Sequence, residues 1–325
     1  MGWDFASDNV RGACPEVARA LAELAGGAAP YGADELTARL ETRLAELFEH
    51  PVAALPVATG TAANALAVAA FTPPHGSVYC HHEAHILRDE AGACEFFAGG
   101  ARLIGLPGEN AKLTPETLDT HLDRCAAGNV HRVRPRLVSI TQSTELGTLY
   151  TPGEVAAIGA WCQANGLALH MDGARFANAV AALGVSPAEL TWKAGVDVLS
   201  LGGTKNGAWA AEALVLFDPE RAEATAIRRK RGGHLLSKGR FLAAQLLALF
   251  EDGTWLANGR HANTQATRLA EGLLTLPGVR PITPTQANEV FLHLPEPLRQ
   301  GLNEAGFGFT PWGDAGPDAI RLVTA

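Results

Sequence analysis

The stretch VDVLSLGGTKNG, Val196–Gly207, carries an apolar, strand-like run into a glycine-rich turn that contains Lys205. An earlier stretch, LALHMDGAR at Leu167–Arg175, has the same form and places Asp172 directly after its apolar run. The two residues are 33 positions apart (205 minus 172), about the length of one strand–helix–strand unit. We therefore expect two neighbouring parallel strands whose carboxyl ends bring Lys205 and Asp172 together.

Other segments repeat this alternation of β-rich and helical runs, which predicts an α/β fold. Short β-rich runs begin at Ser77, Arg136, Leu167, Asp197 and Glu212. Ala- and Leu-rich runs separate them, and a helix is predicted over Pro152–Asn165, with Thr151 as N-cap and Gly166 at its end. We therefore predict a mainly parallel, doubly wound sheet.

The pattern changes near Gly253, which indicates a second, smaller domain. Strand-like pieces such as NEVFLHL and AIRLVT follow a long helical run there. We predict a large domain over residues 51–253, an α+β domain over residues 254–325, and an N-terminal segment, residues 1–50, that packs on the large domain or on the assembly. The last residues, Arg321–Ala325, fall inside a predicted strand, so we expect the C-terminal domain to be truncated.

The composition is that of an acidic, globular protein and argues against several classes of function. Of the 325 residues, 47% are hydrophobic and 18% charged, which excludes a disordered chain. The net charge is −8 and charges of both signs are interspersed, so we expect no nucleic-acid partner. Five cysteines without a C-x-x-C pair indicate neither a disulfide framework nor a zinc site. Because no signal peptide and no membrane-spanning apolar run are visible, we expect a cytoplasmic protein with no membrane partner.

The residue types at positions 205 and 172 suit an aldehyde cofactor. A lysine on a short turn forms an imine with an aldehyde, and its amine becomes nucleophilic when it is partly desolvated or lies near other cations. A buried aspartate needs a positive partner. The protonated ring nitrogen of pyridoxal phosphate is such a partner, and it makes this cofactor a strong electron sink. Lys205 and Asp172 therefore indicate a pyridoxal-phosphate site.

Two further segments are candidates for contacts with the phosphate of such a cofactor. Thr59-Gly60-Thr61 lies between a short strand and an Ala-rich helix, where the N–H groups of a helix N-terminus bind anions, although an ordinary helix cap has the same sequence. The basic run RRKRGGH, Arg228–His234, is either a solvated helix end or a phosphate contact donated to a neighbouring subunit.

The segment CHHEAH, Cys80–His85, follows another predicted strand and has two interpretations. Three histidines and a glutamate are typical of metal sites, but they lack helical i, i+4 spacing and a distant fourth ligand, so we expect no metal. We expect instead that His85 stacks on the cofactor ring and exchanges a proton near the reacting carbon. His81 and His82 are then structural or exposed.

Arg175 follows the predicted cofactor-binding aspartate by three residues. At this spacing on a helix the two side chains share a face. The guanidinium is therefore either a surface salt-bridge partner or a clamp that holds a substrate carboxylate with paired hydrogen bonds.

Eight segments together resemble one known family. They are FASDN (5–9), PYGADEL (30–36), TGTAANALA (59–67), HHEAHILRDEAGACEFFAGGARL (81–103), LHMDGARFANA (169–179), WKAGVDVLSLGGTKNG (192–207), RRKRGGH (228–234) and RLVT (321–324). They are similar to the pyridoxal-phosphate-dependent L-threonine aldolases of low specificity, close to the branch that includes phenylserine aldolases. The resemblance extends from about Ser7 to the last residue, and the DEAGA/EFF and MDGAR…TKNG blocks are specific for it.

The resemblance implies the aspartate-aminotransferase-type fold (fold type I) and a homo-oligomer, usually a tetramer of dimers with shared active sites. It implies that Lys205 forms the Schiff base, that Asp172 pairs with the ring nitrogen, and that His85 stacks on the ring. Gly60 and Thr61 correspond to the positions that hold the phosphate.

The remaining family positions map onto both ends and the middle of the chain. The residues that match the substrate-carboxylate site are Ser7, Arg175 and Arg321. His131, in GNVHRVRP, matches a second active-site histidine near the substrate hydroxyl. Lys230 and Lys238 match basic positions that reach the phosphate of an adjacent subunit.

The activity implied is retro-aldol cleavage of L-threonine, L-allo-threonine or a related amino acid such as L-phenylserine to glycine and an aldehyde. The base that removes the β-hydroxyl proton stays open between His85, His131 and an ordered water. An aminotransferase or a β-eliminating lyase is the main alternative, because Lys205, Asp172 and the phosphate turn are common to all of these enzymes. A non-catalytic cofactor-binding protein is a second alternative.

Overall fold

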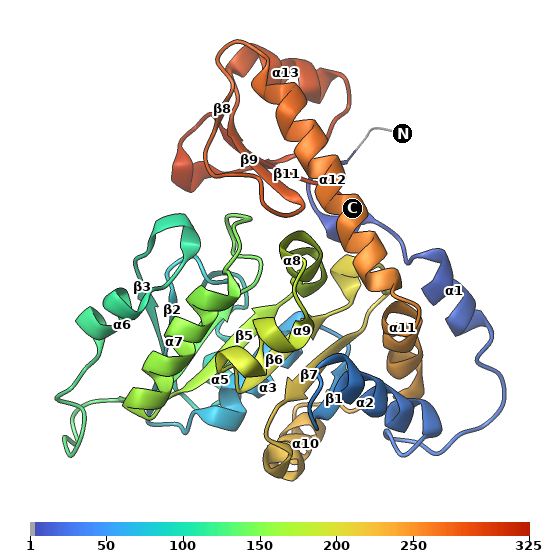
Figure 1. Ribbon diagram of the computed structural model, residues 1–325, viewed down its shortest axis with the longest axis vertical. Helices are drawn as coiled ribbons and strands as arrows, with labels where there is room; N and C mark the ends of the chain where they lie inside the picture. Colours follow the sequence, from blue (N-terminus) through green and yellow to red (C-terminus); the bar gives the residue numbers. More distant parts are fainter. Residues whose placement is uncertain (1–3) are drawn as a thin grey trace.

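A seven-stranded sheet forms the centre of the larger part of the molecule (Figure 1). The computed structural model describes residues 4–325 and places the strands in the order β1-β7-β6-β5-β4-β2-β3. Their bounds are β1 Ala53–Val57, β2 Gly76–His81, β3 Arg102–Leu106, β4 Arg134–Thr141, β5 Ala168–Gly173, β6 Val198–Gly202 and β7 Glu212–Leu216. Strands β3, β2, β4, β5 and β6 are parallel, and β7 runs antiparallel to β6 and β1. The sheet is thus mainly parallel, as the sequence predicts.

Helices cover both faces of this sheet. Those of the large part are α1 Pro15–Ala22, α2 Glu35–Leu47, α3 Gly60–Phe71, α4 His85–Arg88, α5 Ala93–Phe97, α6 Pro115–His121, α7 Pro152–Asn165, α8 Phe176–Leu183, α9 Pro187–Leu190, α10 Ala222–Arg231 and α11 Arg240–Phe250. Figure 1 shows α7 and α9 in front of the sheet and α3 and α5 behind it. Alternate residues of β4 pack to opposite sides, because Val138 and Ile140 join the core of α7 and α8 whereas Leu137 joins that of α3 and α5.

Helix α7 shows why the local sequence predicts these elements well. The side chain of Thr151 accepts a hydrogen bond from the backbone N–H of Glu154, and the Glu154 side chain accepts one from Thr151 in return, which completes a capping box. Pro152 fills the first turn, where no N–H partner is needed. Gly166 ends the helix with φ 70°, a left-handed conformation that glycine adopts without steric strain. The predicted bounds are those observed.

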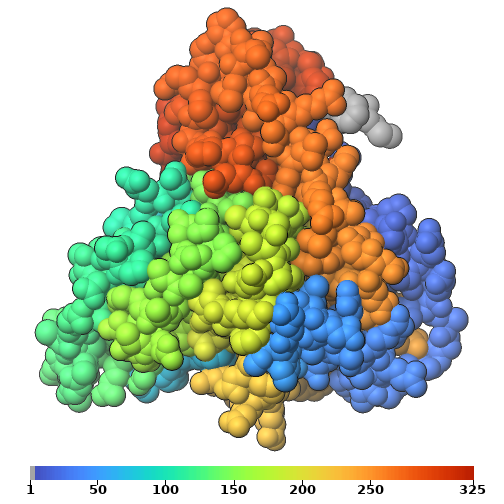
Figure 2. All heavy atoms as spheres, viewed as in Figure 1, coloured from blue at the N-terminus to red at the C-terminus, as the bar shows by residue number. Residues whose placement is uncertain are grey.

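A second, four-stranded antiparallel sheet forms a separate lobe. Its strands, in the order β10-β11-β9-β8, are β8 Arg280–Pro281, β9 Glu289–His293, β10 Thr310–Pro311 and β11 Ala319–Val323. Helices α12 (Thr254–Leu274) and α13 (Glu296–Glu304) accompany it, and apolar residues of α12, β9 and β11 share one core. Figure 2 shows this lobe, orange to red, above the larger part. Helix α12 begins at the first residue of the predicted small domain.

The N-terminal segment joins the second lobe to the first. The backbone of Phe5 bonds to Gly308 at 2.9 Å and to Val323 at 2.7 Å, so this residue lies beside the second sheet. A short 3-10 turn, η1 (Asp8–Val10), then leads toward the large part, where α1 and α2 pack against α11. No helix within residues 4–325 has the length and apolar character needed to cross a membrane.

Candidate active site

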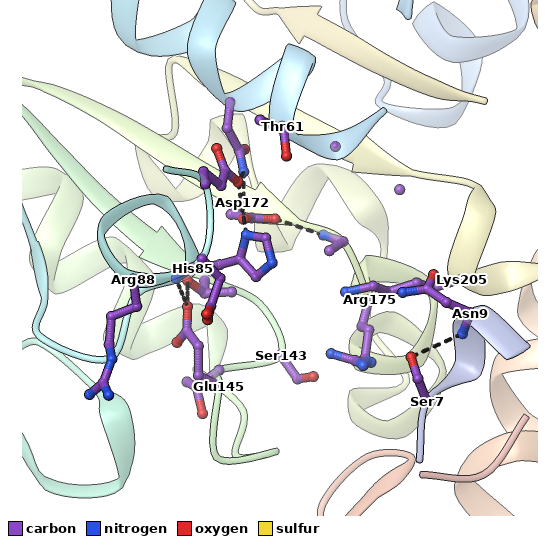
Figure 3. Close-up of a pocket in the computed structure, with 18 of the residues that line it drawn as sticks. Ser7, Asn9, Thr61, His85, Arg88, Ser143, Glu145, Asp172, Arg175 and Lys205 are labelled. Carbon is purple, nitrogen blue, oxygen red and sulfur yellow. Dashed lines mark hydrogen bonds and ion pairs between the residues drawn. The ribbon is translucent and has the colours of Figure 1, made fainter. Parts of the chain in front are cut away.

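A pocket of about 670 Å³ lies between the two lobes, at the carboxyl ends of the central strands (Figure 3). Thr141, Asp172 and Gly202, at the ends of β4, β5 and β6, line its floor. Trp312 and Arg321 of the second sheet's lobe line it from the other side. Binding sites of open α/β folds form at this edge of the sheet, and the volume is that of a small-molecule site.

Lys205 and Asp172 line this same pocket because their strands are neighbours. Asp172 pairs with Ser200 in the register of β5 and β6, and Lys205 follows β6 on the 3-10 turn η4 (Thr204–Asn206). A Cβ atom on Gly202 would lie 2.4 Å from the carbonyl oxygen of Ala174. Only glycine lets the two turns approach so closely.

The surroundings of Lys205 favour its neutral amine. The positive charge of Arg175, followed by burial, lowers the pKa of Lys205. Neither a hydrogen bond nor an ion pair joins Lys205 to another residue between 4 and 325. The amine is therefore a buried nucleophile without a protein partner.

His85 stands at the start of α4 and is held from two sides. Its Nδ1 lies 2.9 Å from Oε1 of Glu90, and its backbone N–H donates to Oε1 of Glu145 at 2.9 Å. The hydrogen bond to Glu90 raises the pKa of His85, and burial raises the pKa of Glu145 to about 7. Figure 3 shows the ring between Asp172 and Glu145. The site thus holds two groups that exchange protons near neutral pH.

The first turn of α3 forms an anion cradle. Thr59 caps the helix by accepting from the N–H of Ala62 at 3.1 Å, and Gly60 and Thr61 line the pocket. The first N–H groups of a helix have no partner within the helix. A Cβ atom on Gly60 would meet no atom within 4 Å, so the space beside this turn is open.

Arg175 already has two acidic partners in the structure. It donates to Asp8 at 2.8 and 3.0 Å, and its Nη1 lies 3.2 Å from Oε1 of Glu289. Burial is the largest single influence on the pKa of Asp8 and raises it, but Arg175, Lys205 and the amide of Asn288 together hold this pKa below its usual value. Arg175 is therefore a buried ion-pair partner of two carboxylates and not a surface salt-bridge partner.

The other predicted carboxylate-binding residues lie beside this cluster. Arg321 is 3.8 Å from Oε1 of Glu289 and donates to the carbonyl of Ala6 at 3.1 Å. Burial lowers the pKa of Arg321. Ser7 lines the pocket and accepts from the N–H of Asn9 at 3.1 Å. The structure thus brings Ser7, Arg175 and Arg321 to one side of the site.

Three predicted residues lie outside the pocket of this chain. His131 sits on an exposed loop between α6 and β4, where its N–H donates to the side chain of Asn129 at 3.0 Å, and its role near the substrate hydroxyl stays a prediction. Lys230 is exposed and lies 4.5 Å over the ring of Tyr31, and Lys238 is exposed ahead of α11. Their role at an adjacent subunit stays a prediction.

The two other histidines of the CHHEAH segment face backbone carbonyls. His81 Nε2 lies 3.0 Å from the carbonyl of Gly108, and His82 Nδ1 lies 3.1 Å from that of Leu106. Across residues 4–325, no group of three or more His, Cys, Asp or Glu side chains is arranged to hold a metal ion.

Several acidic residues of the site escape sequence reasoning. Asp8, Glu145 and Glu289 line or adjoin the pocket through contacts with residues far away along the chain. Asn64 and Glu90 join His85 to Asp172 through hydrogen bonds of 2.8 to 2.9 Å. A signal existed only for Asn64, a polar residue inside an otherwise apolar, Ala-rich helix.

The residues present fit pyridoxal phosphate. Among the residues described, Lys205 has no hydrogen-bond or ion-pair partner. The carboxylate of Asp172 accepts there only from Ala174 at 3.0 Å and Asn64 at 2.8 Å, which leaves acceptor capacity for a ring N–H. The open first turn of α3 suits a phosphate. The buried hydroxyl of Ser143, which also lines the pocket, has no partner among the residues described.

Comparison with known proteins agrees with this geometry. Residues 4–296 match the model of the beta-eliminating lyase family. The chain is 47% identical to a low specificity L-threonine aldolase of Pseudomonas aeruginosa, over 94% of this chain and 88% of the relative. A second such protein, from a Pseudomonas species, is 45% identical over the same shares.

Solved structures give the same family and fold. A Leishmania major threonine aldolase superposes with a TM-score of 0.91 at 30% identity, covering 99% of this chain and 94% of that one. An aspartate aminotransferase from Rhodobacter sphaeroides shares the fold, with a TM-score of 0.74 at 20% identity over 99% of this chain and 88% of that one. The fold and the family expected from the sequence are therefore confirmed. The chain belongs to the low-specificity L-threonine aldolases, a family of carbon–carbon lyases.

Proposed function

We propose that this chain uses pyridoxal phosphate to cleave β-hydroxy-α-amino acids, L-threonine, L-allo-threonine and L-phenylserine among them, to glycine and an aldehyde. The observation that carries the proposal is the unpartnered Lys205 in one pocket with Asp172, His85 and two arginines. The similarity to low specificity L-threonine aldolases supports the choice of reaction.

The chain offers a contact for each part of the cofactor. Lys205 would bind the aldehyde, Asp172 the ring nitrogen, and Gly60 and Thr61 the phosphate. When bound, the cofactor supplies an electron sink for the pair released as the Cα–Cβ bond breaks. Asp172 favours the cationic ring on which this sink depends, because its buried carboxylate gains a positive partner there.

Arg175, Arg321 and Ser7 would bind and orient the substrate carboxylate. Arg175 is held rigidly by Asp8 and Glu289, whereas Arg321 is only loosely paired, with 3.8 Å to Glu289. A carboxylate clamped by two guanidinium groups cannot rotate, so the bond to be broken keeps one direction relative to the cofactor.

His85 would take the proton of the β-hydroxyl group. It is the only histidine among the described residues that lines the pocket, since His131 lies outside it. Glu145, beside the backbone of His85 and with a pKa raised to about 7 by burial, would hold a second proton at neutral pH.

We further propose a cytoplasmic homo-oligomer, dimer or tetramer, in which Lys230 and Lys238 reach the phosphate site of an adjacent subunit. Both lysines are exposed, and the ring of Tyr31 under Lys230 is 50% exposed, so this basic surface is open to an adjacent subunit. All five cysteines are free thiols, as in a reducing compartment. Sedimentation of the purified protein tests the assembly, and a monomer would contradict it.

Product analysis tests the reaction. The purified protein with added pyridoxal phosphate should convert L-threonine and L-phenylserine to glycine plus acetaldehyde or benzaldehyde. A keto acid without aldehyde would favour an aminotransferase or a β-eliminating lyase instead. A cofactor absorbance that no substrate perturbs would favour a non-catalytic protein.

A further inference from the structure

We propose that Glu90 is a positioning residue that, held by Asn64, fixes the ring of His85 with Nε2 facing the pocket. The geometry stands on its own, and its consequence for catalysis rests on the function proposed above. Glu90 and Asn64 are not among the residues to which the family resemblance assigns a role.

Glu90 is a fully buried carboxylate, and the only side chain paired with it that can carry a positive charge among the described residues is His85. Its side chain is 0% exposed, and Oε1 lies 2.9 Å from Nδ1 of His85. Within the described part of the chain, the other oxygen, Oε2, accepts a hydrogen bond only from the thiol of Cys94, at 3.8 Å. No Arg or Lys of residues 4–325 forms an ion pair with Glu90. Burying a charged carboxylate costs free energy unless hydrogen-bond donors compensate it, so the donors to Glu90 must stay in place.

Asn64 supplies the second donor and ties two acidic residues together. Its Nδ2 donates to Oε1 of Glu90 and to Oδ2 of Asp172, each at 2.8 Å. An amide nitrogen has two N–H donors, so both are used, and the amide cannot flip without turning its oxygen toward two carboxylates. Oδ1 of Asn64 is buried without a partner, a sign that the donor side determines the orientation.

These contacts determine which ring nitrogen of His85 carries the proton. A carboxylate only accepts, so the neutral ring keeps its hydrogen on Nδ1 and leaves Nε2 as a free acceptor. Figure 3 shows the second ring nitrogen of His85 directed toward the open centre of the pocket. A carboxylate that orients an imidazole in this way keeps it in the tautomer a general base needs.

The charges around His85 act in both directions. Glu90 and, more weakly, Asp172 raise the pKa of His85, whereas burial and Lys205 lower it. Glu145 accepts from the backbone N–H of His85. Because Glu90 is the largest contribution, removing its charge should lower the pKa of His85 and favour the neutral imidazole at lower pH.

The test is a histidine NMR titration of the full chain, with and without pyridoxal phosphate, in which His85→Asn identifies the resonance. Glu90→Gln should lower the pKa of His85 by about one unit or more, because the change removes a hydrogen-bonded charge. Glu95→Gln is the matched control: it removes a carboxylate from the same helix region, one residue after Cys94, and should leave the titration of His85 unchanged.

Kinetics provides a second measurement that a purely structural residue would not change. The acid limb of the kcat/KM profile for L-threonine should move to lower pH in Glu90→Gln and stay in place in Glu95→Gln. Asn64→Ala should lower kcat more than it raises KM, because it loosens His85 and Asp172 without touching the arginines.

The outcomes separate this proposal from the proposed function. If the wild-type protein does not cleave L-threonine but Glu90→Gln shifts the titration, the positioning role stands and the function fails. If cleavage occurs and His85 titrates alike in wild type and Glu90→Gln, the proposal is overturned alone. If Glu90→Gln does not fold, nitrogen chemical shifts of the wild-type ring decide: hydrogen on Nδ1 supports the proposal, and hydrogen on Nε2 refutes it.

Discussion

Replacing Arg175 with glutamine should separate two roles of this guanidinium, one in stability and one in substrate binding. Arg175 donates to Asp8 at 2.8 and 3.0 Å and faces Glu289 at 3.2 Å, and its side chain is only 10% exposed. Removing the cation leaves two buried carboxylates, of which Glu289 keeps Arg321 at 3.8 Å. Asp8 keeps two neutral side-chain donors, the amide of Asn288 at 3.2 Å and the hydroxyl of Ser7 at 3.5 Å.

The magnitudes differ for the two roles. Breaking a buried pair by removing one partner costs about 3–5 kcal/mol of stability. Each charge-assisted hydrogen bond lost to the substrate carboxylate is worth about 1.5–3 kcal/mol, which corresponds to a rise in KM of roughly 10- to 150-fold. Arg175→Gln should therefore lower the free energy of unfolding and raise KM together.

The double variant Asp8→Asn/Arg175→Gln distinguishes the two effects. Two neutral amides restore a hydrogen bond at the site of the ion pair, so most of the lost stability should return, about 2 kcal/mol or more. KM should stay high, because no guanidinium is left at position 175. Urea unfolding at one protein concentration and initial rates with L-threonine measure the two quantities.

Two results would refute this reasoning. An Arg175→Gln protein as stable as wild type would mean that Asp8 and Glu289 do not depend on Arg175 for their charge. A double variant that recovered both stability and KM would mean that Arg175 does not contact the substrate.

Three further variants have expected outcomes. Asp172→Ala should keep the cofactor attached to Lys205 but slow cleavage greatly, and unchanged turnover would remove the role of the ring nitrogen. Gly202→Ala should lower the melting temperature and weaken cofactor binding, because the new Cβ would lie 2.4 Å from the carbonyl oxygen of Ala174. Gly153→Ala is the control, because its Cβ would meet no atom within 4 Å. Equal effects of the two substitutions would contradict the steric argument. The pKa of Glu145 is about 7 in the folded protein against an ordinary 4.5, so the folded state keeps a proton that the unfolded chain releases, and the stability from this group falls as pH rises from about 4.5 to 7. Glu145→Gln should flatten that part of the stability curve measured by urea unfolding, and an unchanged slope would contradict the assignment.

Local signals explain how much of the fold could be predicted. The runs before Asp172 and Lys205 are strands because each is short, apolar and followed by a glycine-rich turn, and the structure has them as neighbours. The edge strand β3, Arg102–Leu106, gives a weaker signal, because Arg102 and Gly105 are exposed positions within it. Edge strands are partly solvated and lack the continuous apolar pattern of central ones.

The sequence predicts a site residue only where the role of that residue depends on its neighbours along the chain. The turn residues Gly60, Thr61 and Lys205 fall in this class. The pairing of Arg175 with Asp8 joins positions 167 residues apart, and no spacing rule anticipates it. His131, which corresponds to a family position on an exposed loop, lies outside the pocket of this chain, so its role at an active site stays a prediction.

Borohydride reduction of the cofactor-loaded protein, followed by peptide mapping, tests the central claim most directly. The account predicts that the visible absorbance of the bound cofactor disappears on reduction and that the label lies on Lys205 alone. Lys205→Ala should show neither the absorbance nor the label. A label on another lysine, or an absorbance that survives both reduction and substitution, would contradict the assignment of Lys205 as the residue that holds pyridoxal phosphate.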